Sequence, residues 1–257
     1  MPTVREIEKM LFDWAPRELA ADWDNVGLLV GDPSREISRV LVALDITEAV
    51  VAEAIERRAE LIVAHHPVMN CTWHKVQSVR TDDRQGRILT TLLRHDIAAI
   101  CMHTNLDAAE GGVNDALAAA LGLSRVESFN DEKIGRIGVT NCEIPLEQFL
   151  PHVVKSLGCG GIRYLDAKRP VHKVAVGGGA CGSEIGAVLA AGCDTFVTSD
   201  LRYNDFLDTQ GLNLIDAGHF PTEDVICPVI VSFLAEHFPG VETVRSTSHK
   251  EVIQYYT

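Results

Sequence analysis

The stretch RVLVALDITEAVVAEAIERRAELIVAHHP, residues 39–67, sets the fold class of this chain. Its first part, Arg39 to Asp45, is a short apolar run typical of a buried strand. Thr47 can cap a helix over EAVVAEAIERRA, in which apolar residues recur at i, i+3 and i+4 spacing. ELIVA then forms a second apolar run, which ends at His65. This order of strand, helix and strand predicts a βαβ unit and a parallel sheet.

The same alternation continues towards the middle of the chain. A helical pattern over about 83–95 leads to the apolar run IAAICMH at 97–103. VNDALAAALGL at 113–123 predicts the next helix, after a turn at Gly111 and Gly112. Residues 126–170 are less regular, with Gly, Pro and short strand-like runs, which indicates a change of domain.

A second βαβ series begins at residue 172. It comprises the strand and loop HKVAVGGG, the helical SEIGAVLAAG, the strand DTFVTSD, the helical RYNDFLDTQ, the strand LNLIDAGH and a last helix over about 222–237. We therefore predict an α/β fold of two α/β lobes with mainly parallel sheets. The first lobe spans 1–125 and is completed by 213–257, and the second spans 126–212.

Length and charge narrow the class of protein. A chain of 257 residues can form two modest α/β lobes, and no run approaches the ~18 apolar residues that a membrane span needs. The 36 acidic and 23 basic residues give a formal net charge of −13, which disfavours nucleic acid as a partner. The N-terminus shows no signal-peptide cleavage site, and the seven cysteines show no CxxC spacing. We expect a cytoplasmic protein whose cysteines carry no chemistry.

Histidines and carboxylates follow the predicted strands at the point where each strand ends. Ligands of open parallel sheets bind beyond these carboxyl ends, so we expect the site there, between the lobes. Pro67 breaks the strand after two adjacent imidazoles, which lets both reach one site. Two further histidines are each followed, four residues on, by a carboxylate. The predicted metal ligands are His65, His66, His103, Asp107, His219 and Glu223.

This donor set suits two divalent metal ions per chain. Imidazole and carboxylate ligands favour Zn, Fe, Mn or Co and leave the choice among them open. Two ions about 3.5–4 Å apart acidify a bridging water and produce hydroxide near neutral pH. The prediction is hydrolysis of a small-molecule substrate by a metal-bridging hydroxide, without a protein nucleophile. The competing interpretation is structural, because a single strand-end histidine is more often a satisfied core residue than a ligand.

A glycine motif in the second series allows three interpretations. Gly177-x-Gly179-x-x-Gly182 matches the dinucleotide fingerprint, and Asp200 stands near the place of a ribose-binding acid. The same glycines can hold an anion at a helix N-terminus. A tight turn that needs glycine is the third interpretation and the one the sequence favours.

Several single residues outside the predicted ligand set also bear on the site. Asp24 and Asn25 are either partners of the ligating imidazoles or part of a turn. His74 and Lys75 lie in a polar stretch that forms either a loop over the site or an exposed loop. Asp45 is interpreted as leading into a helix. The histidines interpreted as structural are His95, His152, His172, His237 and His249.

Five segments occur in the order found in one known family. They are WDNVGLLVGD (23–32), VAHHP (63–67), HTNLDAAEGGVNDALA (103–118), VTSDLRYNDFLD (197–208) and LIDAGHFPTE (214–223). Together they span essentially the whole chain and resemble the Nif-three-like family, whose members often bear the name GTP cyclohydrolase 1 type 2. The resemblance implies a Nif-three-like fold, a dinuclear metal centre and a toroidal homohexamer with sites facing an internal cavity. It places ligands on His65, His66, Asp107, His219 and Glu223, with His103 as a further ligand.

Three functions follow as hypotheses. The leading one is a metal-dependent hydrolase of a small, nucleotide-like molecule, similar to GTP cyclohydrolase 1 type 2 by resemblance. The second is a metal-handling or scaffold protein without turnover, which is disfavoured because structural zinc usually takes cysteine-rich sites. The third is a protein-interaction module that needs no metal.

Overall fold

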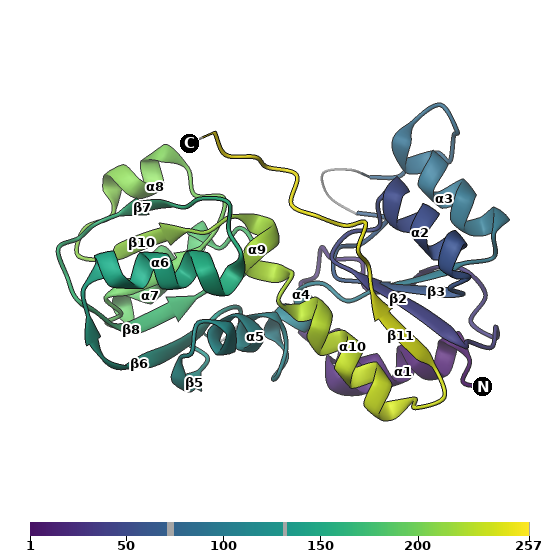
Figure 1. Ribbon diagram of the computed structural model, residues 1–257, viewed down its shortest axis with the longest axis horizontal. Coiled ribbons are helices and arrows are strands. Elements are labelled where there is room, and N and C mark those ends of the chain that lie inside the picture. The colour runs from purple at the N-terminus through teal and green to yellow at the C-terminus, as the bar shows by residue number, and fades with distance from the viewer. Residues whose placement is uncertain (71–74, 131–132, 257) are drawn as a thin grey trace. The chain divides into compact units, whose positions relative to one another are not determined.

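In the computed structural model, which describes residues 1–70, 75–130 and 133–256, the chain divides into two compact units. Unit 1 comprises Met1–Ala109 and Ile226–Lys250, and unit 2 comprises Glu110–Val225 and Glu251–Thr257. Each unit contains one β-sheet with helices on both faces (Figure 1). The chain is therefore mixed α/β, as the sequence predicts.

The described part of unit 1 forms a five-stranded sheet in the order β1-β4-β3-β2-β11. Its strands are β1 (Gly27–Val30), β2 (Arg39–Ala43), β3 (Leu61–Ala64), β4 (Ala98–Cys101) and β11 (Glu242–Arg245). All neighbours are parallel except β1, which is antiparallel to β4. The adjacent strands β2, β3 and β4 therefore end at the same edge of the sheet.

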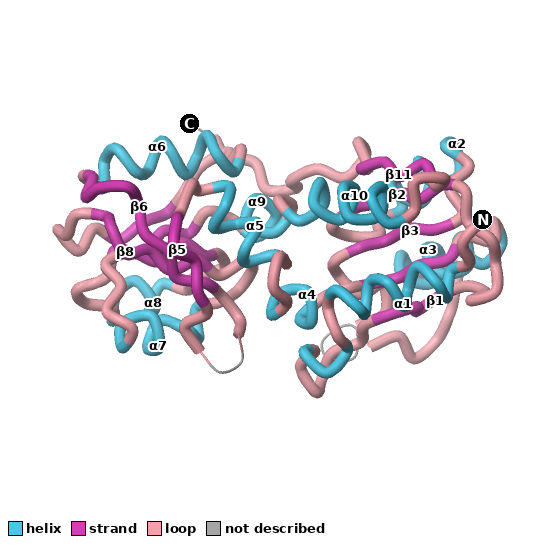
Figure 2. The backbone as a smooth tube through the Cα atoms, turned by 90° about the horizontal axis from the view of Figure 1, so that it is seen from below, coloured by secondary structure: helices cyan, strands magenta, loops and turns pink. Residues whose placement is uncertain are grey.

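Helices cover both faces of this sheet. α2 (Glu48–Arg57) and α3 (Arg84–Arg94) lie on one face, and α1 (Val4–Trp14) and α10 (Ile226–His237) lie on the other (Figures 1 and 2). Thr47 caps α2 as predicted, because its side chain accepts the N–H of Val50. The remaining helical segments of unit 1 are η1 (Arg17–Leu19) and α4 (Thr104–Ala108).

The described part of unit 2 forms a six-stranded sheet in the order β5-β6-β8-β9-β10-β7. Its strands are β5 (Ser124–Glu127), β6 (Arg136–Ile144), β7 (Arg163–Leu165), β8 (Val171–Val176), β9 (Thr195–Thr198) and β10 (Asn213–Asp216). Two apolar clusters cover its faces, one with α5 (Val113–Ala120) and α6 (Leu146–Leu157) and the other with α7 (Ile185–Ala190) and α8 (Tyr203–Asp208). The remaining helical segments are η2 (Gly182–Glu184) and α9 (His219–Glu223).

Unit 2 differs from the sequence prediction in its strand directions and its bounds. Only β8, β9 and β10 run parallel, and the other pairs are antiparallel, so its sheet is mixed. Residues 110–125 and 213–225, which were expected in the first lobe, belong to unit 2. The reason is packing: Leu117 of α5 is buried in a core cluster of unit 2, and β10 pairs with β9.

Two helical segments also differ from the prediction. The last predicted helix is broken into α9 and α10, and the units divide between them at Val225 and Ile226. α6 was not predicted, because Pro151 interrupts its helical pattern in a stretch that otherwise has strand-like runs. Within the described residues, no helix is both long and apolar enough to cross a bilayer.

Candidate metal centre

Three histidines of unit 1 meet at the edge where β3 and β4 end. His65 and His66 follow β3, and His103 follows β4 after Met102. One ligand nitrogen of each lies within 4.8 Å of those of the other two. The ring centroids are 5.0 Å apart for His65–His66, 5.2 Å for His65–His103 and 5.6 Å for His66–His103. Parallel pairing of the two strands is what brings these imidazoles together.

Each of these imidazoles is held through its Nδ1 atom by an oxygen. His65 Nδ1 lies 2.7 Å from the Met102 carbonyl, His66 Nδ1 lies 2.8 Å from Asp45 Oδ1, and His103 Nδ1 lies 2.9 Å from Asp24 Oδ1. Carbonyl and carboxylate oxygens only accept, so Nδ1 carries the hydrogen in each ring. In the neutral ring the lone pair is then on Nε2, the form in which histidine binds a metal.

Asp107 brings a carboxylate to the same cluster. It lies in α4, one turn beyond His103, and its N–H donates to the His103 carbonyl at 3.0 Å. Its Oδ1 atom lies 3.6 Å from Nε2 of the fully buried His65. The short helix after β4 thus carries the carboxylate back towards the imidazoles.

Two carboxylates, the buried Asp24 and the partly exposed Asp45, hold the Nδ1 side of the imidazoles. Asp24 also accepts the N–H and hydroxyl of Thr104, at 3.0 and 2.5 Å. Burial raises the pKa of such a carboxyl, but hydrogen bonds from His103 and Thr104 outweigh it and hold the pKa of Asp24 well below its usual range. Asp45 is similar: burial opposes ionisation, and hydrogen bonds from His249 and His66 lower its pKa strongly. Both act as fixed anions that orient a ring.

The other two predicted ligands lie together in unit 2. α9 begins at His219, directly after Gly218, and ends at Glu223. His219 Nε2 lies 3.0 Å from Glu223 Oε2, and His219 Nδ1 lies 2.6 Å from Asp200 Oδ2. Burial disfavours the imidazolium, but Asp200 and Glu223 outweigh it and raise the pKa of His219 to about 11. Without a metal, His219 is a cation between two carboxylates.

The glycine motif shapes the surroundings of Glu223. The N–H groups of Gly178 and Gly179 donate to Asn114 Oδ1 and Thr222 Oγ1 at 2.8 and 3.1 Å. A Cβ on Gly179, where φ is +64°, would stand 2.1 Å from Glu223 Oε1. These N–H groups are engaged by side chains, and the helix that follows is short. The motif is a close-packed turn, and Asp200, considered as a ribose-binding acid, instead contacts His219.

The structure thus gathers the six predicted ligands in two sets. Unit 1 holds His65, His66, His103 and Asp107, and unit 2 holds His219 and Glu223. Sequence reasoning missed Asp45, although it follows β2 at the same sheet edge as the imidazoles. It also missed His249, which no local pattern marked. Asp24 contacts His103, which confirms the interpretation of Asp24 as a partner of a ligating imidazole.

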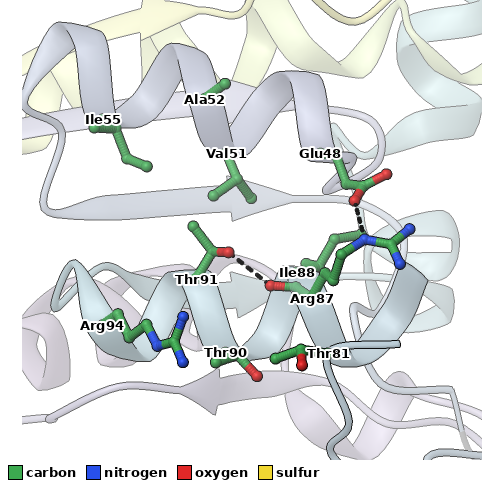
Figure 3. Close-up of a pocket in the computed structure, with 10 residues that line it drawn as sticks. All are labelled: Glu48, Val51, Ala52, Ile55, Thr81, Arg87, Ile88, Thr90, Thr91 and Arg94. Atoms are coloured by element: carbon green, nitrogen blue, oxygen red, sulfur yellow. Dashed lines mark hydrogen bonds and ion pairs between the residues drawn. The ribbon is translucent and has the colours of Figure 1, made fainter. Parts of the chain in front are cut away.

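Other residues that the sequence singled out lie outside these two sets. Asn25 donates to the Met69 carbonyl at 2.7 Å. Lys75 is exposed, and His74 lies outside the described residues. A separate pocket of about 320 Å³ lies between α2 and α3, with Val51 and Ile55 facing Thr91 and Arg94 (Figure 3). Its rim holds an ion pair of Glu48 and Arg87, and no candidate ligand lines it.

The residues of the unit 1 set fit a transition-metal ion. In unit 1 three imidazoles, each fixed at Nδ1, and one carboxylate offer nitrogen and oxygen donors, the set preferred by Zn, Fe, Mn or Co. In unit 2 an imidazole and a buried carboxylate offer the same two donor types. Groups that could hold a metal ion are therefore present in this chain.

Comparison with known proteins identifies relatives along the whole chain. A model of the Duf34/NIF3 (NGG1p interacting factor 3) family matches residues 2–251. A GTP cyclohydrolase 1 type 2 homolog from Clostridium perfringens is 35% identical over 264 residues, covering 98% of this chain and 99% of the relative. One from Streptomyces coelicolor is 36% identical over 254 residues, covering 92% and 87%. A crystal structure of a Bacillus cereus protein related to NIF3 aligns with a TM-score of 0.93 at 26% identity, covering 100% of this chain and 99% of that one.

Proposed function

Because this chain belongs to the Duf34/NIF3 family, we propose that it is a metal-dependent hydrolase with a dinuclear centre. The proposed ligands are those of both sets, His65, His66, His103, Asp107, His219 and Glu223. The proposed substrate is a small, nucleotide-like molecule, following the name GTP cyclohydrolase 1 type 2 homolog that its relatives carry. The observation that carries the proposal is the cluster of three imidazoles whose Nδ1 atoms are all fixed by oxygens.

The side chains of unit 1 supply a rigid set of donors. Orientation by the Met102 carbonyl, Asp45 and Asp24 leaves each ring one nitrogen for a metal. Asp107 adds a carboxylate whose two oxygens allow it to bridge two ions. A pair of divalent ions, when bound, supplies Lewis acidity and lowers the pKa of water for hydrolysis. No side-chain nucleophile is required.

The side chains of unit 2 act differently. His219 must lose a proton before it can bind a metal, and Asp200 stays hydrogen-bonded to its Nδ1. Glu223 is the buried carboxylate that faces the imidazolium, and it would offer an oxygen donor and a negative charge to a bound metal. Asp107 and Glu223 each stand close in sequence to a point where the chain passes from one unit to the other.

A metal-content measurement tests the centre directly. Elemental analysis of protein purified without added metal or chelator should find about two equivalents of transition metal per chain. Asp107→Ala should lower occupancy at both positions, because a bridge is lost. Asp13→Ala, which removes an exposed carboxylate of α1, is the matched control and should retain both ions. A metal titration that saturates at one equivalent of metal per chain would contradict a dinuclear centre.

Turnover separates the hydrolase from a metal-handling protein. The metal-loaded protein should hydrolyse at least one member of a panel of nucleotides, phosphoesters and amides, and Asp107→Ala should lose that activity. Full metal occupancy without turnover on the panel, together with transfer of the ion to a chelating acceptor, would favour the metal-handling alternative.

Assembly and location complete the proposal. We propose that copies of the chain form a toroidal homohexamer in the cytoplasm, as the family resemblance implies. Light scattering coupled to gel filtration should give a mass near six chains of 28.0 kDa. A monomeric or dimeric mass at micromolar concentration would contradict this assembly.

A further inference from the structure

The segment after β11 is tied to α2 by one buried carboxylate. Glu53 accepts from the Ser246 hydroxyl at 2.6 Å, from the Thr247 N–H at 3.1 Å and from the Ser248 N–H at 3.0 Å. Burial opposes ionisation, but these bonds and one from Arg57 outweigh it and lower the pKa of Glu53 to about 2. An ionised, buried carboxylate with this many donors fixes the path of the segment.

Strand pairing places this segment at the edge where the candidate ligands lie. β11 runs parallel to β2, and the Ser246 N–H extends their ladder by donating to the Val42 carbonyl at 2.7 Å. The chain therefore leaves β11 at the edge where β2 ends, two residues before Asp45. The Ser246 hydroxyl also accepts the His249 N–H at 3.3 Å, which links the Glu53 anchor to the histidine.

His249 contacts Asp45 in two places. Its Nε2 lies 3.1 Å from Asp45 Oδ2, and its Nδ1 accepts the Asp45 N–H at 3.4 Å. Since Nδ1 accepts, the hydrogen is on Nε2 and is donated to the carboxylate. The other oxygen, Asp45 Oδ1, holds Nδ1 of His66 at 2.8 Å. Asp45 thus stands between two imidazoles, and the side chain of His249 is 8% exposed.

We propose that His249 is a positioning residue for the metal centre, which acts on His66 through Asp45 and is itself anchored by Glu53. The inference rests on the proposed metal-binding function and adds a residue to it. Asp45 can rotate about its side-chain bonds, and the bond from His249 Nε2 to Oδ2 holds the carboxylate whose other oxygen orients the His66 ring. The bond from the Asp45 N–H to Nδ1 fixes the His249 ring itself. The loss of a partner bonded directly to a ligand, as Asp45 is to His66, weakens metal binding about 10- to 100-fold, and the loss of His249 should fall at the lower end of this range.

Titration with Co²⁺, followed by its visible absorption bands, measures this role without any substrate. His249→Ala should weaken Co²⁺ binding about tenfold and shift the bands, because the His66 ring is no longer fixed. His249→Gln should recover part of the affinity, since its amide can donate to Asp45 Oδ2. His237→Ala, at the exposed end of α10, is the matched control and should leave binding and bands unchanged.

A double variant shows whether the effect passes through Asp45. Asp45→Asn combined with His249→Ala should bind Co²⁺ no more weakly than Asp45→Asn alone, because residues of one network give non-additive effects. Additive losses, or His249→Ala with wild-type affinity and bands, would overturn the positioning role. Circular dichroism and the unfolding midpoint identify any variant that has lost its fold, and His249→Gln then carries the test.

Substitution of a proposed metal ligand distinguishes failure of the positioning role from failure of the proposed metal-binding function. If His66→Ala abolishes Co²⁺ binding while His249→Ala does not alter it, the metal centre stands and the positioning role is wrong. If His66→Ala and His65→Ala both bind Co²⁺ like the wild type, the proposed metal centre is wrong and the positioning role falls with it.

Discussion

In unit 1 the candidate ligands come from separate strand ends, whereas in unit 2 both stand on one short helix. His65, His66 and His103 meet only because β3 and β4 are parallel neighbours. His219 and Glu223 meet because residues four apart lie on the same face of a helix. The first set is therefore a product of sheet topology, and the second needs only a local helical turn.

The two sets also differ in how their histidines are held. His65 is fully buried and donates to a backbone carbonyl, while the side chain of His219 is 36% exposed and lies between two carboxylates. Each imidazole of unit 1 has its Nδ1 engaged by an oxygen and presents Nε2 for a metal, whereas the imidazolium in unit 2 must first lose a proton. The comparison teaches that one set is preorganised and the other is gated by protonation.

The largest expected effect comes from the buried ring of unit 1. His65→Ala should lower the free energy of unfolding of the metal-free protein by about 3 kcal/mol, because it leaves a cavity and removes the bond to the Met102 carbonyl. His95→Ala, at the exposed end of α3, should cost less than about 0.5 kcal/mol. Urea unfolding after dialysis against a chelator measures both. Equal free energies of unfolding for the two variants would contradict a stabilising role of the buried His65 ring.

The next effect tests how tightly unit 2 encloses Glu223. Gly179→Ala should destabilise the protein by at least about 2 kcal/mol more than Gly192→Ala, because its new Cβ would overlap Glu223 Oε1. Both glycines have positive φ, +64° and +73°, but nothing lies within 4 Å of a Cβ on Gly192. The backbone strain is thus matched and only the overlap differs. Thermal unfolding of the two variants gives the comparison, and similar midpoints would contradict a close approach at Gly179.

The smallest expected effect is the pH dependence of the protonated histidine in unit 2. The pKa of His219 is raised from 6.5 to about 11, so its contribution to stability is fully present below pH 6.5 and is lost as the pH rises through about 11. The unfolding midpoint of metal-free wild type should therefore fall relative to His219→Gln between pH 7 and 10. A constant difference across this range would show that His219 is not held as a cation.

The sequence predicted the local features well because these are encoded over short distances. The apolar run of β2, the Thr47 cap and the helix α2 follow from neighbouring residues, and the structure confirms them. The pairing of His219 with Glu223 also depends on spacing alone. The family was recognised from short motifs, and the family model confirms it.

The hydrogen-bond partners of the candidate imidazole ligands were harder to predict from the sequence. The sequence allows two interpretations of Asp24 and predicts that Asp45 leads into a helix. The sequence marks no partner for His249, because Asp45, the residue it contacts, lies far away in the chain. A hydrogen bond between such distant residues has no periodic signature.

By itself, the sequence determined the α/β class, the family and the identity of the candidate donors, since apolar period, capping and motif spacing are local properties. Only the tertiary structure decided which unit α5 and β10 join, which strands are antiparallel in unit 2, and which oxygen holds each imidazole. These depend on which apolar faces pack together and which strand ends become neighbours. Both are determined by the burial of apolar surface over the whole chain, for which no short segment is sufficient by itself.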